Sequence, residues 1–177
     1  MARFPAHPDF RARLMWWTAF WVFILDQATK WLVVHRLDLI TRQSIDVLPP
    51  YINLRMAWNR GVNFGLFADY DMRWVLVAVA IAITAFVVWW MRRDGGSRPA
   101  HVAAGLLIGG ALGNVIDRIL YGAVADFLNM SCCGIENPYA FNVADIAVFA
   151  GAVGLVFLGG GTDNPQKPPK NAQKKST

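Results

Sequence analysis

Four apolar stretches dominate the sequence and restrict the folds that it can adopt. They run from Leu14 to Val34, from Trp74 to Met91, from Ala100 to Ile116 and from Ile146 to Leu158. The hydrocarbon core of a bilayer is about 30 Å thick, and a helix of roughly 20 mostly apolar residues crosses it. These stretches therefore predict an all-α membrane protein in which four transmembrane helices form a bundle.

The composition agrees with a membrane protein and argues against other classes. Hydrophobic residues make up 55% of the 177 residues and charged residues only 16%, whereas soluble domains average roughly 45–50% and about 25%. This composition excludes disordered and fibrous chains. The formal net charge of +5 comes largely from segments that flank the apolar stretches. It therefore indicates orientation in a membrane and no nucleic-acid partner.

The basic residues predict which ends of the helices face the cytoplasm. Arg92, Arg93 and Arg98 lie in the short link between the second and third stretches, and several lysines lie in the tail at 161–177. Cytoplasmic segments of membrane proteins are rich in Lys and Arg. We therefore expect this link, the N-terminus at 1–13 and the tail on the cytoplasmic side. The tail is also rich in proline and polar residues, which predicts disorder.

The two longer connections, 37–73 and 119–141, then face outward from a membrane domain that covers 14–160. In the first connection, residues 51–58 loosely alternate in polarity and include aromatic residues, and a turn sequence follows at 59–61. This pattern is typical of β-strands bounded by turns. We therefore expect a small β-structured lid of one or two strands at 37–73 and an outward loop at 119–141.

Several polar side chains lie in or beside the predicted helices, and the cost of placing ionisable groups there makes them candidate functional residues. Asp26 and Lys30 are one helical turn apart and are expected to pair along one face of the first helix. A self-neutralising structural pair explains them as well as a functional role does. Asn114, Asp117 and Arg118 form a second group near the outward end of the third helix.

Two aspartates, Asp126 and Asp145, are the sharpest candidates for catalysis. Asp126 follows the third stretch and Asp145 immediately precedes the fourth, so antiparallel neighbouring helices bring both to the outward end. Two carboxylates at close range cannot both ionise cheaply, so the pKa of one rises. One then acts as a base on water while the other, protonated, polarises a carbonyl, as in aspartic proteases. From spacing alone, a helix cap at Asp145 and a solvated loop residue at Asp126 remain equally good explanations.

Metal and cofactor sites find little support in the sequence. Cys132 and Cys133 are the only cysteines, and because they are adjacent they cannot link distant segments. His7, His35 and His101 lie far apart and lack partners at metal-ligand spacing. We therefore expect no metal and no cofactor.

Two rival functions also fit the polar residues. In a proton-coupled carrier, Asp26, Asp117, Asp126 and Asp145 would relay protons, although such proteins favour carboxylates near the middle of the membrane. In a non-catalytic assembly protein, the small residues of the third stretch would bind another helix. The assembly protein leaves the two outward aspartates without a role. From the residues alone, an enzyme and a carrier are equally supported.

Five short motifs, in order along residues 14–160, resemble those of the lipoprotein signal peptidase (signal peptidase II) family of bacteria. They are Asp26-Gln27-Ala28-Thr29-Lys30, Asn59-Arg60-Gly61-Val62-Asn63-Phe64-Gly65, Gly109-Gly110-Ala111-Leu112-Gly113-Asn114-Val115-Ile116-Asp117-Arg118, Val124-Ala125-Asp126-Phe127 and Phe141-Asn142-Val143-Ala144-Asp145. Each motif alone is a weak signal, whereas five in order on four helices are a strong one.

The resemblance implies an aspartic endopeptidase of the bacterial inner membrane, with its active site near the periplasmic face and both termini in the cytoplasm. Its substrates would be prolipoproteins, cleaved on the N-terminal side of a diacylglyceryl-modified cysteine. The motifs make Asp126 and Asp145 the catalytic pair and give Asp26 and Lys30 a structural role. The supporting polar residues would be Asn59, Gly61, Asn114, Asp117, Arg118 and Asn142. Its expected partners are lipidated prolipoproteins and the bilayer, and we expect a monomer.

Overall fold

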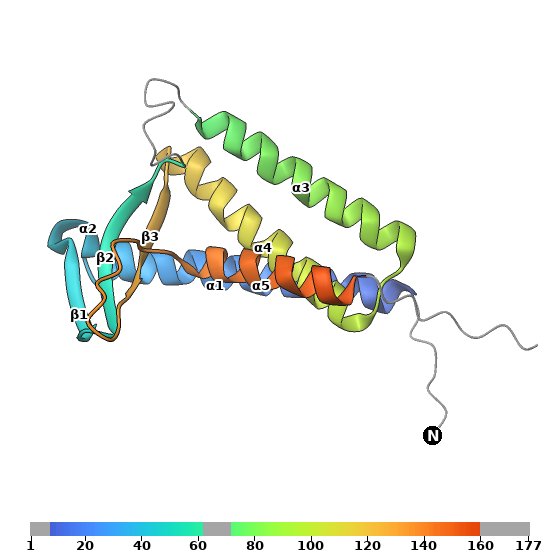
Figure 1. Cartoon of the computed structure of the whole chain (residues 1–177). Coiled ribbons are helices and arrows are strands. Elements are labelled where there is room, and N and C mark those ends of the chain that lie inside the picture. Colours follow the sequence, from blue (N-terminus) through green and yellow to red (C-terminus); the bar gives the residue numbers. More distant parts are fainter. Residues whose placement is uncertain (1–7, 62–71, 160–177) are drawn as a thin grey trace, which may run out of the picture.

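The computed structural model describes residues 8–61 and 72–159. Within them, the longest elements are the helices α1 (Pro8–Lys30), α3 (Arg73–Asp94), α4 (Arg98–Tyr121) and α5 (Val143–Leu158). A small sheet lies at one end of these helices (Figure 1). The start of α1, the end of α5 and the connection between α3 and α4 lie at the other end. Three segments named above lie outside the described residues. They are residues 1–7, residues 62–71, which include the end of the second motif, and the predicted tail at 161–177.

The helices contain the four apolar stretches but differ from them at their ends. α1 already begins at Pro8, within the segment predicted as an N-terminal extension, and it continues as a π-helix, η1 (Trp31–Arg36). α5 begins at Val143, earlier than hydropathy predicts, because the side chain of Asn142 caps its first turn. Hydropathy does not detect such a polar first turn.

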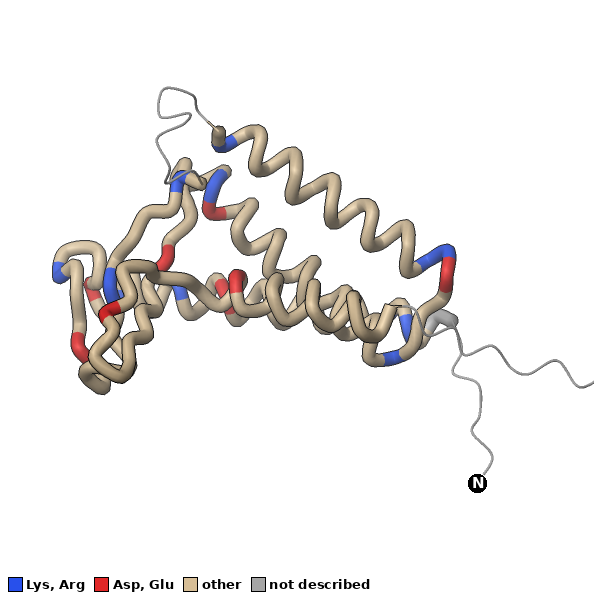
Figure 2. Tube along the Cα trace, in the orientation of Figure 1, with Lys and Arg blue, Asp and Glu red and all other residues tan. Residues whose placement is uncertain are grey.

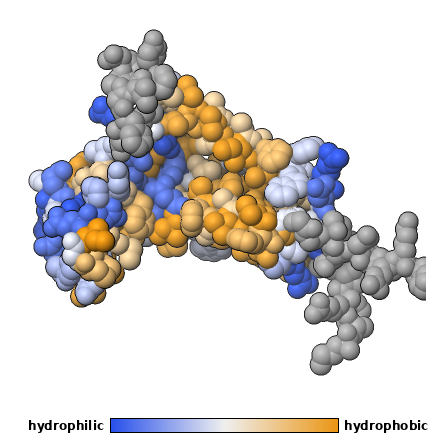
Figure 3. Space-filling model, in the orientation of Figure 1, coloured by the Kyte–Doolittle hydropathy of each residue, from blue (hydrophilic) through white to orange (hydrophobic). Residues whose placement is uncertain are grey.

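The helices show features of a membrane protein. α3 and α4 are long and apolar enough to cross a membrane, and α5 is a shorter apolar helix of 16 residues. Large side chains of α3 such as Trp74, Phe86 and Trp89 are exposed. Figure 2 shows no charged residue in the middle of α3, and Figure 3 shows a broad apolar surface over the helices. The structure thus supports an apolar helical membrane protein. Among the described residues, two of the four predicted spans therefore lie in helices that are both long enough and apolar enough to cross a membrane, namely α3 and α4.

The β-structure predicted within 37–73 is present. After a short helix, α2 (Leu39–Arg42), the chain forms the antiparallel strands β1 (Ser44–Leu48) and β2 (Ile52–Asn59). In Figure 1 these strands run across the ends of the helices. The alternating pattern at 51–58 therefore identified β2 correctly, although β1 extends earlier than this pattern.

A third strand, β3 (Val124–Met130), lies in the segment that was predicted as a loop at 119–141. It pairs antiparallel with β2, so that β2 is the central strand of the sheet. Its residues from Val124 to Phe127 are all buried, so the strand lacks the alternating polarity by which half-buried strands are recognised. Cys132 and Cys133, in the connection that follows, form a disulfide with each other and link no distant segments.

α4 is the central helix and packs against α1, α3 and α5. Small residues permit this close packing, as is common between helices in membranes. At Gly151 of α5, an added Cβ atom would lie 2.5 Å from the backbone nitrogen of Leu107 and 2.6 Å from the carbonyl oxygen of Ala103. The backbones of α4 and α5 are therefore in direct contact at Gly151. This contact joins the middle of α5 to the first half of α4.

We expect the substitution Gly151→Ala to lower the thermal unfolding midpoint of the purified protein in detergent. Alanine favours a helix over glycine by about 1 kcal/mol, but the new methyl group would meet backbone atoms that cannot rotate away. Overpacking of this kind costs roughly 1–3 kcal/mol. Ala150→Leu, at an exposed position of the same helix, is the matched control and should leave the midpoint unchanged. An unchanged midpoint for Gly151→Ala would contradict the close contact of α4 and α5.

Candidate active site

Asp145 lies in the first turn of α5 and forms a capping box with Asn142. The Oδ1 atom of Asn142 accepts a hydrogen bond from the backbone nitrogen of Asp145 at 2.9 Å. In return, Oδ2 of Asp145 accepts one from the backbone nitrogen of Asn142 at 3.1 Å. This reciprocal arrangement fixes the orientation of both side chains. Asp145 therefore does cap its helix, but its second carboxylate oxygen points to another partner.

That partner is Asn114 of α4. Its Nδ2 atom donates to Oδ1 of Asp145 at 2.9 Å. The amide oxygen of Asn114 accepts hydrogen bonds from Nδ2 of Asn142 and from Nζ of Lys30, each at 3.3 Å. Both ends of the Asn114 amide are thus engaged, which fixes the direction in which it donates. Asn114 holds the carboxylate of Asp145 from α4.

Asp126 lies on β3 and its residue is only 3% exposed. Its Oδ1 atom accepts a hydrogen bond of 2.6 Å from Nδ2 of Asn142. Its Oδ2 atom accepts one of 3.1 Å from Nδ2 of Asn59 at the end of β2. Asn59 is oriented in turn by the backbone nitrogen of Gly61, which donates to Oδ1 of Asn59 at 2.8 Å. Asn142 therefore contacts both aspartates, one through its side chain and the other through its backbone.

The environment of Asp126 favours its protonated form. Burial raises the pKa of this carboxyl group, and the nearby negative charge of Asp145 raises it further, to about 7 from an ordinary value of 3.8. Hydrogen bonds from Asn59 and Asn142 act in the opposite direction but do not cancel these effects. Asp145 lies at the N-terminus of a helix, where the helix dipole stabilises negative charge. The two carboxyl groups thus have different electrostatic surroundings, as an acid and a base require.

A buried ionic cluster lies beside this pair. Nζ of Lys30 lies 2.8 Å from a carboxylate oxygen of Asp26 and 2.8 Å from one of Asp117. Oδ1 of Asp26 accepts a hydrogen bond from the backbone nitrogen of Ala144 at 2.9 Å, and Oδ2 of Asp117 accepts one from that of Ala125 at 3.3 Å. Asp26 and Lys30 pair as their spacing predicts. The cluster also connects α1 and α4 to the residues that precede Asp126 and Asp145.

The structure thus divides the supporting residues predicted from the motifs. Asn59, Asn114 and Asn142 donate directly to the two aspartates, and Gly61 acts through Asn59. Asp117 belongs to the ionic cluster. The guanidinium group of Arg118 donates to the backbone oxygen of Asn114 at 3.3 Å, and within 8–61 and 72–159 no hydrogen bond joins it to either aspartate.

Gln27 belongs to the same cluster and was not among the predicted site residues. Its Nε2 atom donates to Asp26 at 3.1 Å and to Asp117 at 3.0 Å. A polar amide beside Asp26, within an otherwise apolar stretch, was a signal that pointed to such a role. Among the residues that the structure describes, no group of three or more His, Cys, Asp or Glu side chains could hold a metal ion.

The raised pKa of Asp126 predicts how its replacement changes stability with pH. In the unfolded chain this carboxyl group loses its proton near pH 4, whereas in the folded protein it does so near pH 7. Its contribution to stability is therefore fully present below about pH 4 and is lost as the pH rises through about 7. The measurement is the thermal unfolding midpoint of Asp126→Asn minus that of the protein without the substitution. We expect this difference to increase between pH 4 and 7 and then to level off.

Asp46→Asn is the control for this measurement, because Asp46 is exposed on β1. Its difference from the unchanged protein should vary less over the same pH range. A difference for Asp126→Asn that is constant with pH would show that Asp126 ionises equally in the folded and unfolded chains.

Comparison with known proteins identifies the family. Residues 18–159 match the family described as signal peptidase (SPase) II. A lipoprotein signal peptidase of Methylobacterium sp. (strain 4-46) is 45% identical over 141 residues, covering 78% of this chain and 84% of the relative. One of Methylorubrum extorquens (strain PA1) is 48% identical over 134 residues, covering 75% and 77%.

Two solved structures of bacterial membrane enzymes are also similar to this one. The first has a TM-score of 0.66 and 28% identity, covering 90% of this chain and 92% of the other. The second has a TM-score of 0.68 and 29% identity, covering 79% and 88%. The family match and the identity to lipoprotein signal peptidases show that the chain belongs to the signal peptidase II family.

Proposed function

We propose that this membrane protease removes the signal peptide from prolipoproteins by an aspartic mechanism, with Asp126 and Asp145 as its catalytic pair. Family membership and the lipoprotein signal peptidases among its relatives support the protease activity and the class of substrate. The catalytic assignment is carried by one observation. Asn142 donates to Asp126 through its side chain and to Asp145 through its backbone, and so holds the two carboxyl groups together.

The different surroundings of the pair suggest a separate role for each carboxyl group. With its pKa raised to about 7, Asp126 holds a proton near neutral pH and donates it toward the oxygen of the scissile carbonyl. Asp145, at the positive end of α5, takes a proton from water as the water attacks the carbonyl carbon. As the resulting tetrahedral intermediate breaks its carbon–nitrogen bond, the proton on Asp145 passes to the leaving amine. One hydroxyl group of the intermediate returns its proton to Asp126 as the new carboxyl group forms, which restores the starting state of both aspartates.

The neighbouring polar residues orient this pair and the substrate. Asn59, Asn114 and Asn142 hold the carboxyl groups by the hydrogen bonds described above. Nε of Arg118 is buried and makes no hydrogen bond within the described part of the chain, so it is available to a carbonyl oxygen of the substrate. Asp26 and Lys30 have a structural role, which is to hold α1 against the start of α5.

The orientation in the membrane follows from the distribution of charge. Arg92, Arg93 and Arg98 lie at the α3–α4 connection, at the end of the helices away from the sheet, where Figure 2 shows a group of basic residues. By the positive-inside rule this end is cytoplasmic. The four long helices then cross the inner membrane with both termini in the cytoplasm. The sheet and the catalytic pair lie near the periplasmic face, where a membrane-anchored signal peptide ends.

We expect Asp126→Asn and Asp145→Asn each to reduce the cleavage of a lipidated prolipoprotein by several orders of magnitude. Asparagine has nearly the same shape but supplies neither a carboxylic acid nor a general base. Because the two residues act as a unit, the double variant should be little worse than either single variant. The rate of product formation by purified protein is the measurement. Asp46→Asn, on the exposed strand β1, should retain full activity.

Two results would contradict the aspartic mechanism. One is an Asp126→Asn enzyme that keeps most of its activity. The other is an activity that is lost with a chelator and restored by zinc, which would indicate a metalloprotease. In both cases the amounts of folded protein in the membrane are compared first, so that a loss of expression is not mistaken for a loss of catalysis.

We also expect the enzyme to cleave a diacylglyceryl-modified prolipoprotein far faster than the same chain without the lipid. Burial of an acyl chain contributes about 0.8 kcal/mol of binding free energy per methylene. The bilayer buries the same chains, so much of this free energy does not favour binding to the enzyme. The remaining benefit is orientation, because an anchored cysteine holds the preceding peptide bond at the depth of Asp126 and Asp145. Matched substrates with and without the lipid provide the test. Equal rates would favour a general signal peptidase.

A further inference from the structure

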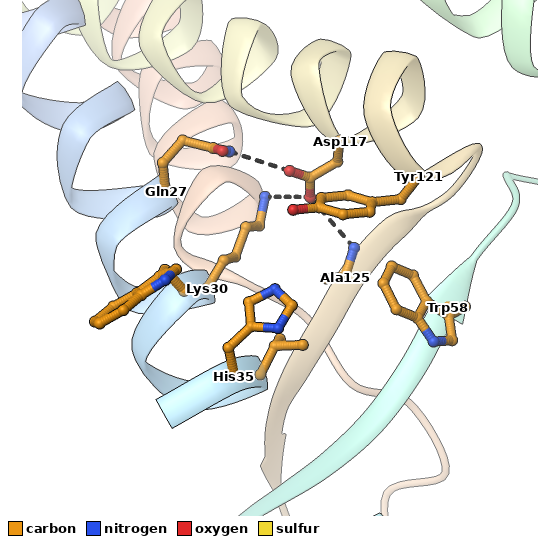
Figure 4. Close-up of a pocket in the computed structure, with 9 residues that line it drawn as sticks. Gln27, Lys30, His35, Trp58, Asp117, Tyr121 and Ala125 are labelled. Carbon is orange, nitrogen blue, oxygen red and sulfur yellow. Dashed lines mark hydrogen bonds and ion pairs between the residues drawn. The ribbon is translucent and has the colours of Figure 1, made fainter. Parts of the chain in front are cut away.

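A cavity of about 270 Å³ lies on the opposite side of the sheet from the catalytic pair. It is bounded by the ends of α1 and α4 and by β2 and β3 (Figure 4). Ala125 and Trp58 line it, whereas their neighbours Asp126 and Asn59 bond to each other in the catalytic site. Because successive side chains of a strand point to opposite faces, the cavity and the catalytic site are separate. None of the roles assigned above uses this cavity.

The polar side of the cavity offers negative charge and a hydrogen-bond acceptor. Lys30, Asp117 and Gln27 form it, as Figure 4 shows. The three protons of the Lys30 ammonium group are directed to Asp26, Asp117 and Asn114, so this cation is already fully engaged. With Asp26 and Asp117 around one lysine, the formal charge of the cluster is −1, and Asp117 is the carboxylate of the cluster that lines the cavity. No described residue donates to Oε1 of Gln27, which remains an open acceptor.

The other walls are aromatic. Trp31, Trp58 and Tyr121 line the cavity, and the rings of Trp58 and Tyr121 lie 5.8 Å apart between centroids. Faces of Trp and Tyr rings attract cations. His35 also lines the cavity, and its ring can donate a hydrogen bond to an anion. The combination of a net negative cluster, an open acceptor and aromatic faces is suited to a ligand that is a cation and a hydrogen-bond donor.

We propose that this cavity binds the headgroup of a phospholipid that carries a primary ammonium, of the ethanolamine class. The ammonium group lies among the aromatic rings and donates to Gln27, and the phosphate accepts from His35. A choline headgroup has no N–H to donate, and a glycerol headgroup has no positive charge. One water fills about 30 Å³ of liquid, so the cavity holds a headgroup but not acyl chains.

The position of the cavity agrees with a lipid as the source of this headgroup. It lies at the sheet end of α1 and α4, where the apolar surface of the helices meets the hydrophilic surface of the sheet (Figure 3). This boundary is the level at which a bilayer places its headgroups. Trp31 and Tyr121 are 60% and 53% exposed, and amphipathic rings of this kind are typical of the membrane interface. The acyl chains remain in the bilayer beside the helices.

Native mass spectrometry of the purified full-length protein tests this site. The protein in detergent is mixed with three dioleoyl phospholipids in equal amounts, with ethanolamine, choline or glycerol headgroups. We expect the ethanolamine lipid to be retained at the highest occupancy. Trp58→Leu should reduce its preference by about fivefold or more, because one cation–π wall is lost, whereas Trp58→Phe should keep most of it. Trp89→Leu, at an exposed tryptophan of α3, is the matched control and should change nothing.

Further variants and ligands make the result decisive. Tyr121→Leu removes the other ring of the aromatic pair and should reproduce the loss even if Trp58→Leu disturbs β2. Asp126→Asn should keep the lipid preference, since the site is independent of the proposed peptidase reaction. Equal occupancy by the glycerol lipid, or an unchanged preference in both ring variants, would overturn the proposal. Loss of the lipid preference in Asp126→Asn would also overturn it. The same holds if an equal concentration of phosphoethanolamine, which has no acyl chains, displaces the ethanolamine lipid.

Discussion

The buried ammonium group of Lys30 is the interaction on which the rest of the structure depends. It pairs with Asp26 on its own helix and with Asp117 on α4. Those two carboxylates accept hydrogen bonds from the backbone nitrogens of Ala144 and Ala125, the residues that precede Asp145 and Asp126. Removing one member of a buried ionic group leaves an uncompensated charge, at a cost of several kcal/mol. The same cluster that stabilises the helices therefore also positions the proposed catalytic residues.

The three asparagines around the proposed catalytic pair hold both carboxyl groups in place while the pKa of Asp126 stays raised. Asn59, Asn114 and Asn142 hold the carboxyl groups by hydrogen bonds at 2.6–3.1 Å. Because amides are neutral, they leave the repulsion between Asp126 and Asp145 in place, and the pKa of Asp126 remains high. A lysine or arginine in direct contact would lower this pKa and favour two ionised carboxylates. Lys30 is instead paired with Asp26 and Asp117, and its charge lowers the pKa of Asp126 less than the hydrogen bonds from the asparagines do.

Sequence patterns predicted the helices and strands that contact water or lipid. They were less able to predict the elements that contact mainly residues distant in the sequence. Apolar stretches predicted the helices because their lipid-facing side chains must be apolar, and the partly buried strand β2 showed a loose alternation of polar and apolar residues. β3 is buried and showed no such pattern. Spacing grouped Asp117 with Asn114, and both contact Lys30. However, the bonds of Asp117 to Lys30 and to the backbone of Ala125 depend on how α1 and the sheet pack against α4. Asp145 showed that one residue can cap a helix and also raise the pKa of a nearby carboxyl group.

The hydrogen bond from the backbone nitrogen of Ala125 to Asp117 connects the ionic cluster to β3, the strand that carries Asp126. β3 separates two environments, because Ala125 lines the aromatic cavity and Asp126 bonds to Asn59 and Asn142. A shift of the strand by one residue would turn every side chain to the opposite face and would remove Asp126 from the site. Pairing with β2 sets this register and places Asp126 opposite Ala57, just after an irregularity between Leu54 and Ala57. Asp117, fixed in turn by Lys30 and Gln27, binds the backbone at the residue before Asp126. The ionic cluster thus adds a second constraint to the strand pairing, and both hold Asp126 beside Asn59 and Asn142.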